Sequence, residues 1–222
     1  MARVEPPNGT AANEPRLSRA CVGRLSLYLR RLEELNREGA EKVSSGRLGE
    51  ALGVTDAQVR KDLASLGNLG QPGIGYPTQE LTTAIRGALG IDRDWSVALV
   101  GVGNLARALL RYRGFAQQGF RVVALFDTDK TKIGQRLEGL TIHGLDDLPK
   151  VIAATNAELG LLAVPAEAAQ TVADALVAAG IRGVLNFAPV VLRLPGSVSL
   201  VSVDLTVQLE QLAFLVQMGG KV

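Results

Sequence analysis

The chain has 222 residues, of which 47% are hydrophobic and 21% charged, and its formal net charge at pH 7 is +2. This composition predicts a globular protein of one large or two modest domains, and so small a net charge gives no argument for nucleic-acid binding by itself. No apolar run reaches the ~18–20 residues of a membrane span, and the single cysteine, Cys21, excludes an intrachain disulfide.

Residues 1–15 are rich in Pro, Asn, Gly, Thr and Ala and lack the apolar centre of a signal peptide. We therefore expect a disordered tail and a cytoplasmic protein. An amphipathic helix follows, with Leu25, Tyr28 and Leu32 at helical spacing. Ser44 and Ser45 are N-cap residues for a second predicted helix, at 46–52.

Thr55 is the predicted N-cap of a third helix, at 56–66, and Gly53 forms a tight turn between the second and third helices. Exposed Gln58, Arg60 and Lys61 on that third helix complete a helix-turn-helix pattern. The glycines at 67–75 predict a tight β-hairpin, the wing of a winged helix, and a short helix at 78–89 follows. We expect a winged-helix DNA-binding domain at 16–90.

The remainder alternates apolar runs with helical patterns, which predicts an α/β fold with parallel strands and right-handed crossovers. Predicted strands are 96–101, 121–126, 159–164, 182–186 and 198–203, and predicted helices are 104–118, 145–154, 166–179 and 205–218. Residues 91–204 are therefore expected to form a Rossmann-type doubly wound parallel sheet.

A glycine-rich turn follows the first of these strands and opens a helix. Gly101 permits the tight turn, Gly103 lets the backbone approach a pyrophosphate, and Ala106 is small enough for close helix–strand packing. Asp127 ends the next strand, where its carboxylate can accept hydrogen bonds from an adenosine ribose 2′-OH and would repel a 2′-phosphate. This pattern predicts a dinucleotide site that favours NAD(H) over NADP(H).

The last predicted helix is apolar on almost every side, and such a helix must bury most of its faces. Because it lies at a chain end, we expect residues 205–222 to form a dimerisation helix exchanged between two subunits of a homodimer.

Taken together, these segments resemble the Rex family of bacterial redox-sensing transcriptional repressors from about residue 16 onward. The quoted motifs run from 25–30, 43–48, 58–63 and 73–76 in the first part to 99–105, 126–127, 163–170, 180–189 and 203–204 in the second. At the wing tip, where family members commonly carry a basic residue, this chain has Gln71 and Pro72. The resemblance implies a homodimer that binds an inverted-repeat DNA operator and is released from it by NADH.

If the third helix lies in a major groove, Arg60 and Lys61 can reach a guanine and a phosphate, and Gln58 an adenine. The DNA-binding candidates are Ser44, Ser45, Arg47, Gln58, Arg60, Lys61, Gly70 and Gly73. The cofactor-binding candidates are Gly101, Val102, Gly103, Asn104, Leu105, Ala106, Tyr112, Asp127, Val164, Pro165, Asn186, Phe187 and Pro189.

The resemblance implies a switch in which Tyr112 changes partners near the nicotinamide and Asp204, otherwise a helix N-cap, pairs with Arg30. His143, the only histidine, is predicted to lie away from the strand ends, so we expect neither catalytic residues nor a metal site. Two alternatives remain open: an NAD-dependent dehydrogenase with an added N-terminal domain, and an NADH-binding dimer whose winged helix binds protein.

Overall fold

The computed structural model describes residues 17–71 and 73–219, and the chain divides into two units between Asp92 and Arg93. The tail predicted at 1–15 and Pro72 of the predicted wing lie outside the described residues. Each unit has its own hydrophobic core.

Four helices and a two-stranded antiparallel sheet make up the described part of the first unit. They are α1 (Arg19–Arg37), β1 (Lys42–Val43), α2 (Ser45–Leu52), α3 (Asp56–Ala64), β2 (Tyr76–Pro77) and α4 (Thr78–Ala88). Ser44 and Thr55 cap α2 and α3, because each side chain accepts the backbone N–H three residues on. Ser45, the second predicted cap, is instead the first residue of α2.

The turn and wing of this unit depend on glycines. Gly53 ends α2 in the left-handed conformation, with φ +66°, and the chain turns directly into α3. The tight hairpin predicted at 67–76 takes a different form: Gln71 and Gly75 pair with each other, but Tyr76 pairs with Val43 from before α2. The wing is thus tied to the helix-turn-helix through β1.

The second unit is a seven-stranded sheet in the order β5-β6-β4-β3-β7-β8-β9, parallel except for the β5–β6 pair. Its strands are β3 (Trp95–Val100), β4 (Phe120–Phe126), β5 (Arg136–Leu137), β6 (Leu140–His143), β7 (Leu159–Leu162), β8 (Gly183–Asn186) and β9 (Ser199–Ser202). Its helices are α5 (Asn104–Arg111), α6 (Arg113–Gln117), α7 (Leu148–Thr155, after a 3-10 turn at Leu145–Asp147), α8 (Ala166–Ala178) and α9 (Leu205–Gln217).

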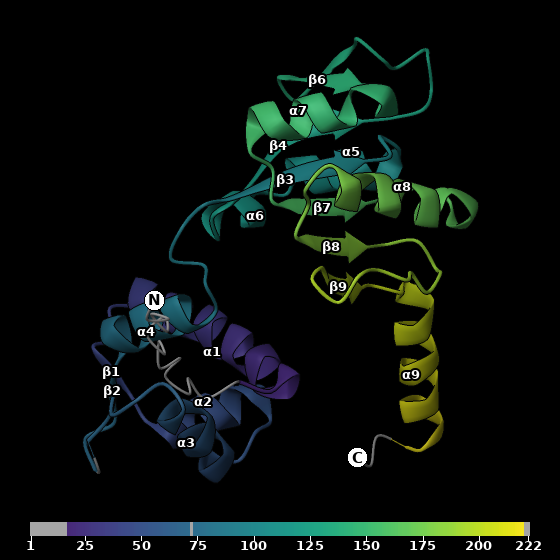
Figure 1. Cartoon of the computed structure of the whole chain (residues 1–222). Helices are drawn as coiled ribbons and strands as arrows, with labels where there is room; N and C mark the ends of the chain where they lie inside the picture. The colour runs from purple at the N-terminus through teal and green to yellow at the C-terminus, as the bar shows by residue number, and fades with distance from the viewer. Residues whose placement is uncertain (1–16, 72, 220–222) are drawn as a thin grey trace, which may run out of the picture. The chain divides into compact units, whose positions relative to one another are not determined.

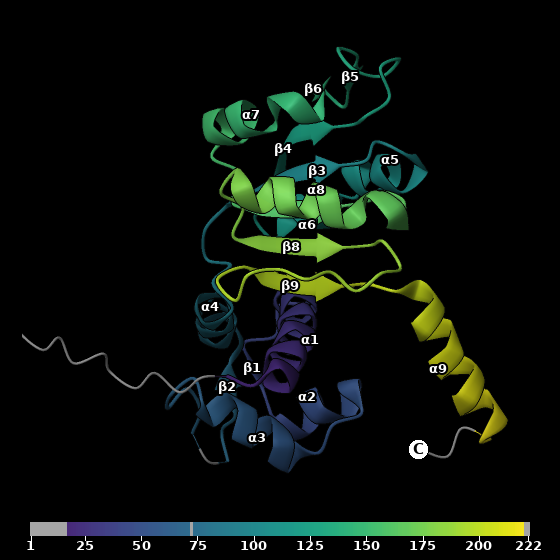
Figure 2. The same cartoon turned by 45° about the vertical axis from the view of Figure 1, so that its right-hand side comes forward.

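Side chains alternate between the two faces of this sheet, and helices cover both. Ala98 and Val100 of β3 lie in the core beneath α7 and α8, whereas Val97 and Leu99 lie in the core beneath α5 and α6. Figures 1 and 2 show these helices on opposite faces. The predicted doubly wound α/β fold is confirmed.

Two local features differ from the prediction. The helix predicted at 104–118 is broken at Tyr112, whose ψ of 103° is extended, into α5 and α6. The β5–β6 hairpin was not predicted, because strands of two and four residues carry too little alternation to be recognised.

Helix α9 departs from the other helices of its unit because every residue in it is exposed. It extends from the end of β9 away from the sheet (Figures 1 and 2). Its exposed apolar side chains are Leu205, Val207, Leu209, Leu212, Phe214, Leu215 and Val216. None of the helices in the described ranges has the length and apolar character needed to span a bilayer.

Candidate functional site

The glycine-rich turn lies between β3 and α5, at the carboxyl end of the central strand. Gly101 has φ +93°, and a Cβ there would collide with the carbonyl oxygen of Ala163, so the position requires glycine. Gly103 has φ −94° and open space where a Cβ would stand. Ala106 is fully buried beneath the sheet. The backbone N–H groups of Asn104, Leu105 and Ala106 begin α5, where anions bind favourably.

Asp127 braces this turn from the end of β4. Its Oδ2 accepts the Val102 N–H at 2.9 Å and Lys132 Nζ at 2.9 Å, and its Oδ1 accepts the Asp129 N–H at 2.9 Å. Burial raises the pKa of Asp127, but the hydrogen bonds from Asp129, Lys132 and Val102 outweigh it and lower the pKa overall. A carboxylate has about four lone-pair sites, so Oδ1 keeps capacity to accept a ribose hydroxyl.

Lys132 was not a predicted site residue, although it follows the strand-ending acid by only five positions. Its ammonium forms ion pairs with Asp127 at 2.9 Å and Asp129 at 3.7 Å. The charge at this strand end is therefore partly compensated, which weakens the repulsion of a 2′-phosphate that Asp127 alone would exert.

Four further cofactor candidates lie beyond the ends of β7 and β8, and a fifth, Asn186, is the last residue of β8. Val164 and Phe187 are half-buried, and Pro165 and Pro189 are exposed. Asn186 is fully buried; its amide donates to the carbonyls of Ala188 and Val190 and accepts the Ala188 N–H. Asn186 therefore holds the shape of the 186–190 turn.

Tyr112 lies between α5 and α6, and His143 lies at the end of a strand. Tyr112 is 57% exposed and packs edge-on against Phe115 with ring centroids 5.3 Å apart, over Gly114, where a Cβ would collide with the tyrosine ring. The prediction that His143 lies away from the strand ends is wrong: it is the last residue of β6, and its carbonyl accepts the Asp127 N–H. That short strand was not recognised in the sequence.

Most of the DNA-binding candidates lie on α2 and α3, and Ser44 caps α2. Ser44, Arg47, Arg60 and Lys61 are exposed, and Ser45 is half-buried. The prediction that Gln58 is exposed is wrong: it is half-buried, because its amide packs against the buried Asp62. The guanidinium of Arg60 pairs with Asp56 one turn earlier and donates to Ser45 Oγ at 3.4 Å. In the wing, Gly73 has φ +77° and Gly70 leaves room for the ring of Tyr76.

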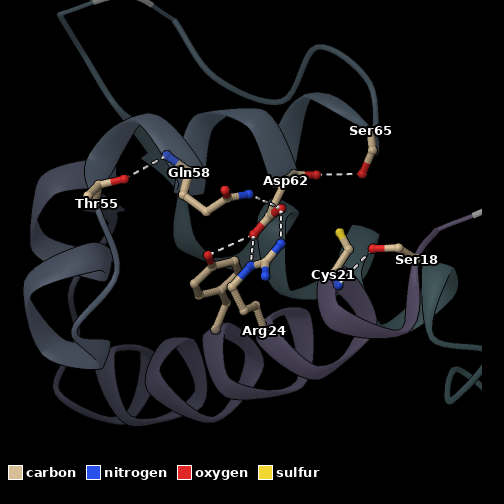
Figure 3. A network of polar contacts seen from close by, with 8 residues as sticks. Ser18, Cys21, Arg24, Thr55, Gln58, Asp62 and Ser65 are labelled. Carbon is tan, nitrogen blue, oxygen red and sulfur yellow. Dashed lines mark hydrogen bonds and ion pairs between the residues drawn. The ribbon is translucent and has the colours of Figure 1, made fainter. Parts of the chain in front are cut away.

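Asp62 lies on the inner side of α3 and was not a predicted site residue. It is 4% exposed and accepts hydrogen bonds from Arg24, Tyr28 and Gln58 (Figure 3). The hydrogen bonds from Arg24 lower the pKa of Asp62 to about 2, against the opposing effect of burial. Burial raises the pKa of Tyr28 to about 12, so its hydroxyl stays protonated and donates.

Because the pKa of Asp62 is low in the folded protein, its contribution to the free energy of unfolding should be lost in acid. Because the folded pKa of Asp62 lies below the unfolded value, its contribution is complete above about pH 4 and is lost as pH falls through 2. We expect Asp62→Asn to lower the free energy of unfolding by about 2 kcal/mol at pH 7. Urea unfolding of both proteins from pH 7 to pH 2 measures this; a difference that does not shrink towards pH 2 would contradict it.

The predicted switch residues lie in different units. Arg30 is an exposed residue of α1. Asp204 caps α9, accepting the N–H groups of Thr206 at 2.9 Å and Val207 at 3.4 Å. Within the described residues no cluster of three or more His, Cys, Asp or Glu side chains could hold a metal ion.

Comparison with known families divides the chain in the same way. The model described as "Putative DNA-binding protein N-terminus" matches residues 16–64, and the model described as "CoA binding domain" matches residues 92–190. Fold, sites and matches define a DNA-binding regulator whose second domain is of the nucleotide-binding Rossmann type. The chain is 47% identical over 199 residues to the redox-sensing transcriptional repressor Rex of Carboxydothermus hydrogenoformans, covering 90% of this chain and 96% of that protein. The chain belongs to the Rex family of redox-sensing transcriptional repressors.

Further relatives and solved structures agree with this assignment. The Rex repressor of Rhodopirellula baltica is 47% identical over 201 residues, with 90% of this chain and 85% of that protein covered. The crystal structure of RSP in complex with β-NAD⁺ and operator DNA matches with TM-score 0.86 and 33% identity, covering 91% of this chain and 94% of that one. RSP in complex with β-NADH matches with TM-score 0.84 and 32% identity, covering 92% and 96%. The family consists of repressors, so the dehydrogenase alternative is set aside.

Proposed function

We propose that this protein is a transcriptional repressor that binds an inverted-repeat operator as a homodimer and leaves it when NADH is bound. The observation that carries the proposal is the match of both units to RSP, a repressor solved with operator DNA and NAD⁺ and also with NADH. Two further features support the proposal: Arg60 and Lys61 are exposed on α3, and the turn at Gly101 has open space beside Gly103. We place the repressor in the cytoplasm, where operator DNA and NADH are both accessible.

In this proposal α3 lies in the major groove, and Ser44, Ser45 and Arg47 contact the phosphate backbone. Gly70 and Gly73 shape the wing. The N-terminus of α5 and the open side of Gly103 receive the pyrophosphate of the dinucleotide, and Asp127 receives the adenosine ribose through Oδ1. Val164, Pro165, Phe187 and Pro189 surround the nicotinamide, where apolar groups disfavour the positively charged ring of NAD⁺.

DNA and NADH are then negatively coupled ligands, and each lowers the affinity of the other by the same factor. We assign Arg30, Tyr112 and Asp204 to the path of this coupling. When NADH is bound, Asp204 pairs with Arg30 and Tyr112 changes partners, and the two winged helices no longer match the half-site spacing.

Cofactor choice is the first test of the second unit. We expect Asp127→Asn to weaken NADH binding about tenfold, because a hydrogen bond to a charged acceptor is lost. The same change should narrow the preference for NADH over NADPH, whereas Lys132→Gln should widen it by removing the compensating cation. Fluorescence titrations with both cofactors measure this. If Asp127→Asn leaves both the NADH affinity and the NADH-dependent loss of DNA binding unchanged, the cofactor assignment is wrong.

The exposed apolar surface of α9 supports the homodimer. Leu205, Leu209, Leu212 and Val216 recur at helical spacing and are 55% to 72% exposed, a stripe that a second subunit would bury. We expect Leu209→Glu with Leu212→Glu to give a monomer in sedimentation velocity and to weaken operator binding. The matched control is Gln208→Glu with Gln217→Glu on the same helix. A glutamate variant that remains dimeric would contradict a dimer formed through α9.

A winged helix can also bind protein, and salt dependence separates the two functions. DNA binding through phosphate contacts weakens steeply with salt because counterions are released. We expect the wild-type protein to bind a labelled inverted-repeat operator more tightly than a scrambled duplex at 50 to 200 mM salt. Equal, salt-insensitive binding to both duplexes with normal NADH binding would indicate a protein partner instead.

A further inference from the structure

Helix α3, which carries the predicted base-reading residues, is fixed to α1 by a buried carboxylate. Asp62 Oδ2 accepts Arg24 Nε at 2.6 Å and Oδ1 accepts Arg24 Nη2 at 2.8 Å, so that the guanidinium binds it through two parallel hydrogen bonds. The Tyr28 hydroxyl donates to Oδ2 at 3.0 Å, also from α1. Figure 3 shows the Arg24 side chain reaching from α1 to Asp62 beneath α3.

The geometry of this contact fixes more than the distance between two helices. Val59 and Leu63 also bury α3 against the core, but apolar contacts tolerate small rotations and shifts. A bidentate arginine–carboxylate pair is planar and directional, so it sets the rotation of α3 about its own axis as well. Arg60 and Lys61 immediately precede Asp62 and rotate with it.

The same carboxylate determines which way the Gln58 amide faces. Gln58 Nε2 donates to Asp62 Oδ1 at 2.8 Å, and an ionised carboxylate can receive only the NH₂ end of an amide. One Nε2 hydrogen is used in this contact. The second hydrogen and Oε1 are the pair of groups that a bidentate contact with adenine N7 and N6 requires.

We propose that Arg24 and Asp62 form a clamp that positions DNA readout, holding α3 and the Gln58 amide in the orientation that discriminates bases without contacting DNA themselves. Both Asp62 and Arg24 are positioning residues in this scheme, acting through Gln58, Arg60 and Lys61. The clamp rests on the proposed DNA-binding function and adds to it a determinant of sequence specificity on α1.

The test uses Arg24→Lys in the full-length protein, because lysine keeps the charge and most of the packing but cannot make two parallel hydrogen bonds. We expect affinity for the operator to fall about tenfold, the value of one good base contact, with affinity for a scrambled duplex unchanged. The slope of log affinity against log salt and the NADH affinity should also be unchanged. Arg37→Lys, an exposed arginine on the same helix, is the matched control.

Each other outcome contradicts the proposed clamp and points to a different role for Arg24. A salt slope reduced by about one would mean that Arg24 contacts a phosphate directly. Equal losses for operator and scrambled DNA would mean general destabilisation, and no loss for either would mean that the pair only fills the core. Wild-type protein that does not distinguish operator from scrambled DNA overturns the proposed function itself, and with it the clamp, before any variant is compared.

A double-mutant cycle tests whether the clamp acts through Gln58. Gln58→Ala should lower operator affinity in the wild-type background and should have little further effect when Arg24→Lys is present. Replacing the Asp62 carboxylate in Asp62→Asn should reproduce the loss of discrimination. Additive effects of Arg24→Lys and Gln58→Ala would contradict the coupling.

Discussion

Replacing Arg60 and Lys61 together by glutamine is expected to lower operator affinity by about 100-fold or more, since each base or phosphate contact contributes roughly 1–3 kcal/mol. Both side chains are exposed on α3, and neither lies in the hydrophobic core of its unit, so the fold should be retained. The salt slope should also fall, because a phosphate contact is lost. Fluorescence anisotropy of labelled operator at several salt concentrations measures both effects.

The matched control for that double variant is Arg37→Gln with Lys150→Gln, which removes the same charges from exposed positions outside α2, α3 and the wing. We expect nearly unchanged operator affinity from the control and normal NADH binding from both proteins. If the control loses as much affinity as the α3 variant, the contribution of α3 is only its charge. The assignment of α3 as the reading helix would then be wrong.

Gly103→Val is expected to abolish the response to NADH while leaving DNA binding intact. A Cβ at Gly103 meets open space within the protein, and the φ of −94° is one that valine adopts, so the unit should fold normally. The added side chain would occupy the side of the turn at which the pyrophosphate must approach the backbone. We expect NADH affinity to fall on the order of 100-fold, about 2.7 kcal/mol.

Gly101→Ala gives a useful contrast at the other end of the turn. With φ +93° and the Ala163 carbonyl in the way, this change should destabilise the unit as well as weaken binding. Thermal unfolding with and without NADH separates the two variants: Gly103→Val should keep the wild-type midpoint without ligand and gain nothing from NADH. A Gly103→Val protein stabilised by NADH like the wild type would place the cofactor elsewhere.

Local sequence patterns predicted most of the fold and the elements that carry the two candidate sites. Glycine turns and helix caps depend on only a few neighbouring residues. The roles of Gly53, Thr55 and the turn at Gly101 could therefore be predicted from the local sequence. The two-residue strands of the wing and the β5–β6 hairpin were missed, because their pairing depends on partners distant in the chain or on too few residues to show a pattern.

The side-chain contacts that support the two candidate sites could not be predicted from the sequence for the same reason. Arg24 and Asp62 are 38 residues apart, and nothing near either one identifies the other as its partner. Asp127 was expected to face a ribose, but the structure adds that it braces Val102 and pairs with Lys132. These contacts connect residues that only the folded chain brings together.

In the proposed function, NADH and operator DNA are negatively coupled ligands of one dimer. The most direct measurement is anisotropy of a labelled inverted-repeat duplex bound to the protein at fixed salt, titrated separately with NADH and NAD⁺. We predict that NADH releases the operator at a much lower concentration than NAD⁺ does, and that NADH affinity falls by a matching factor when operator is present. Operator binding that NADH leaves unchanged, although NADH binds the protein, would contradict it.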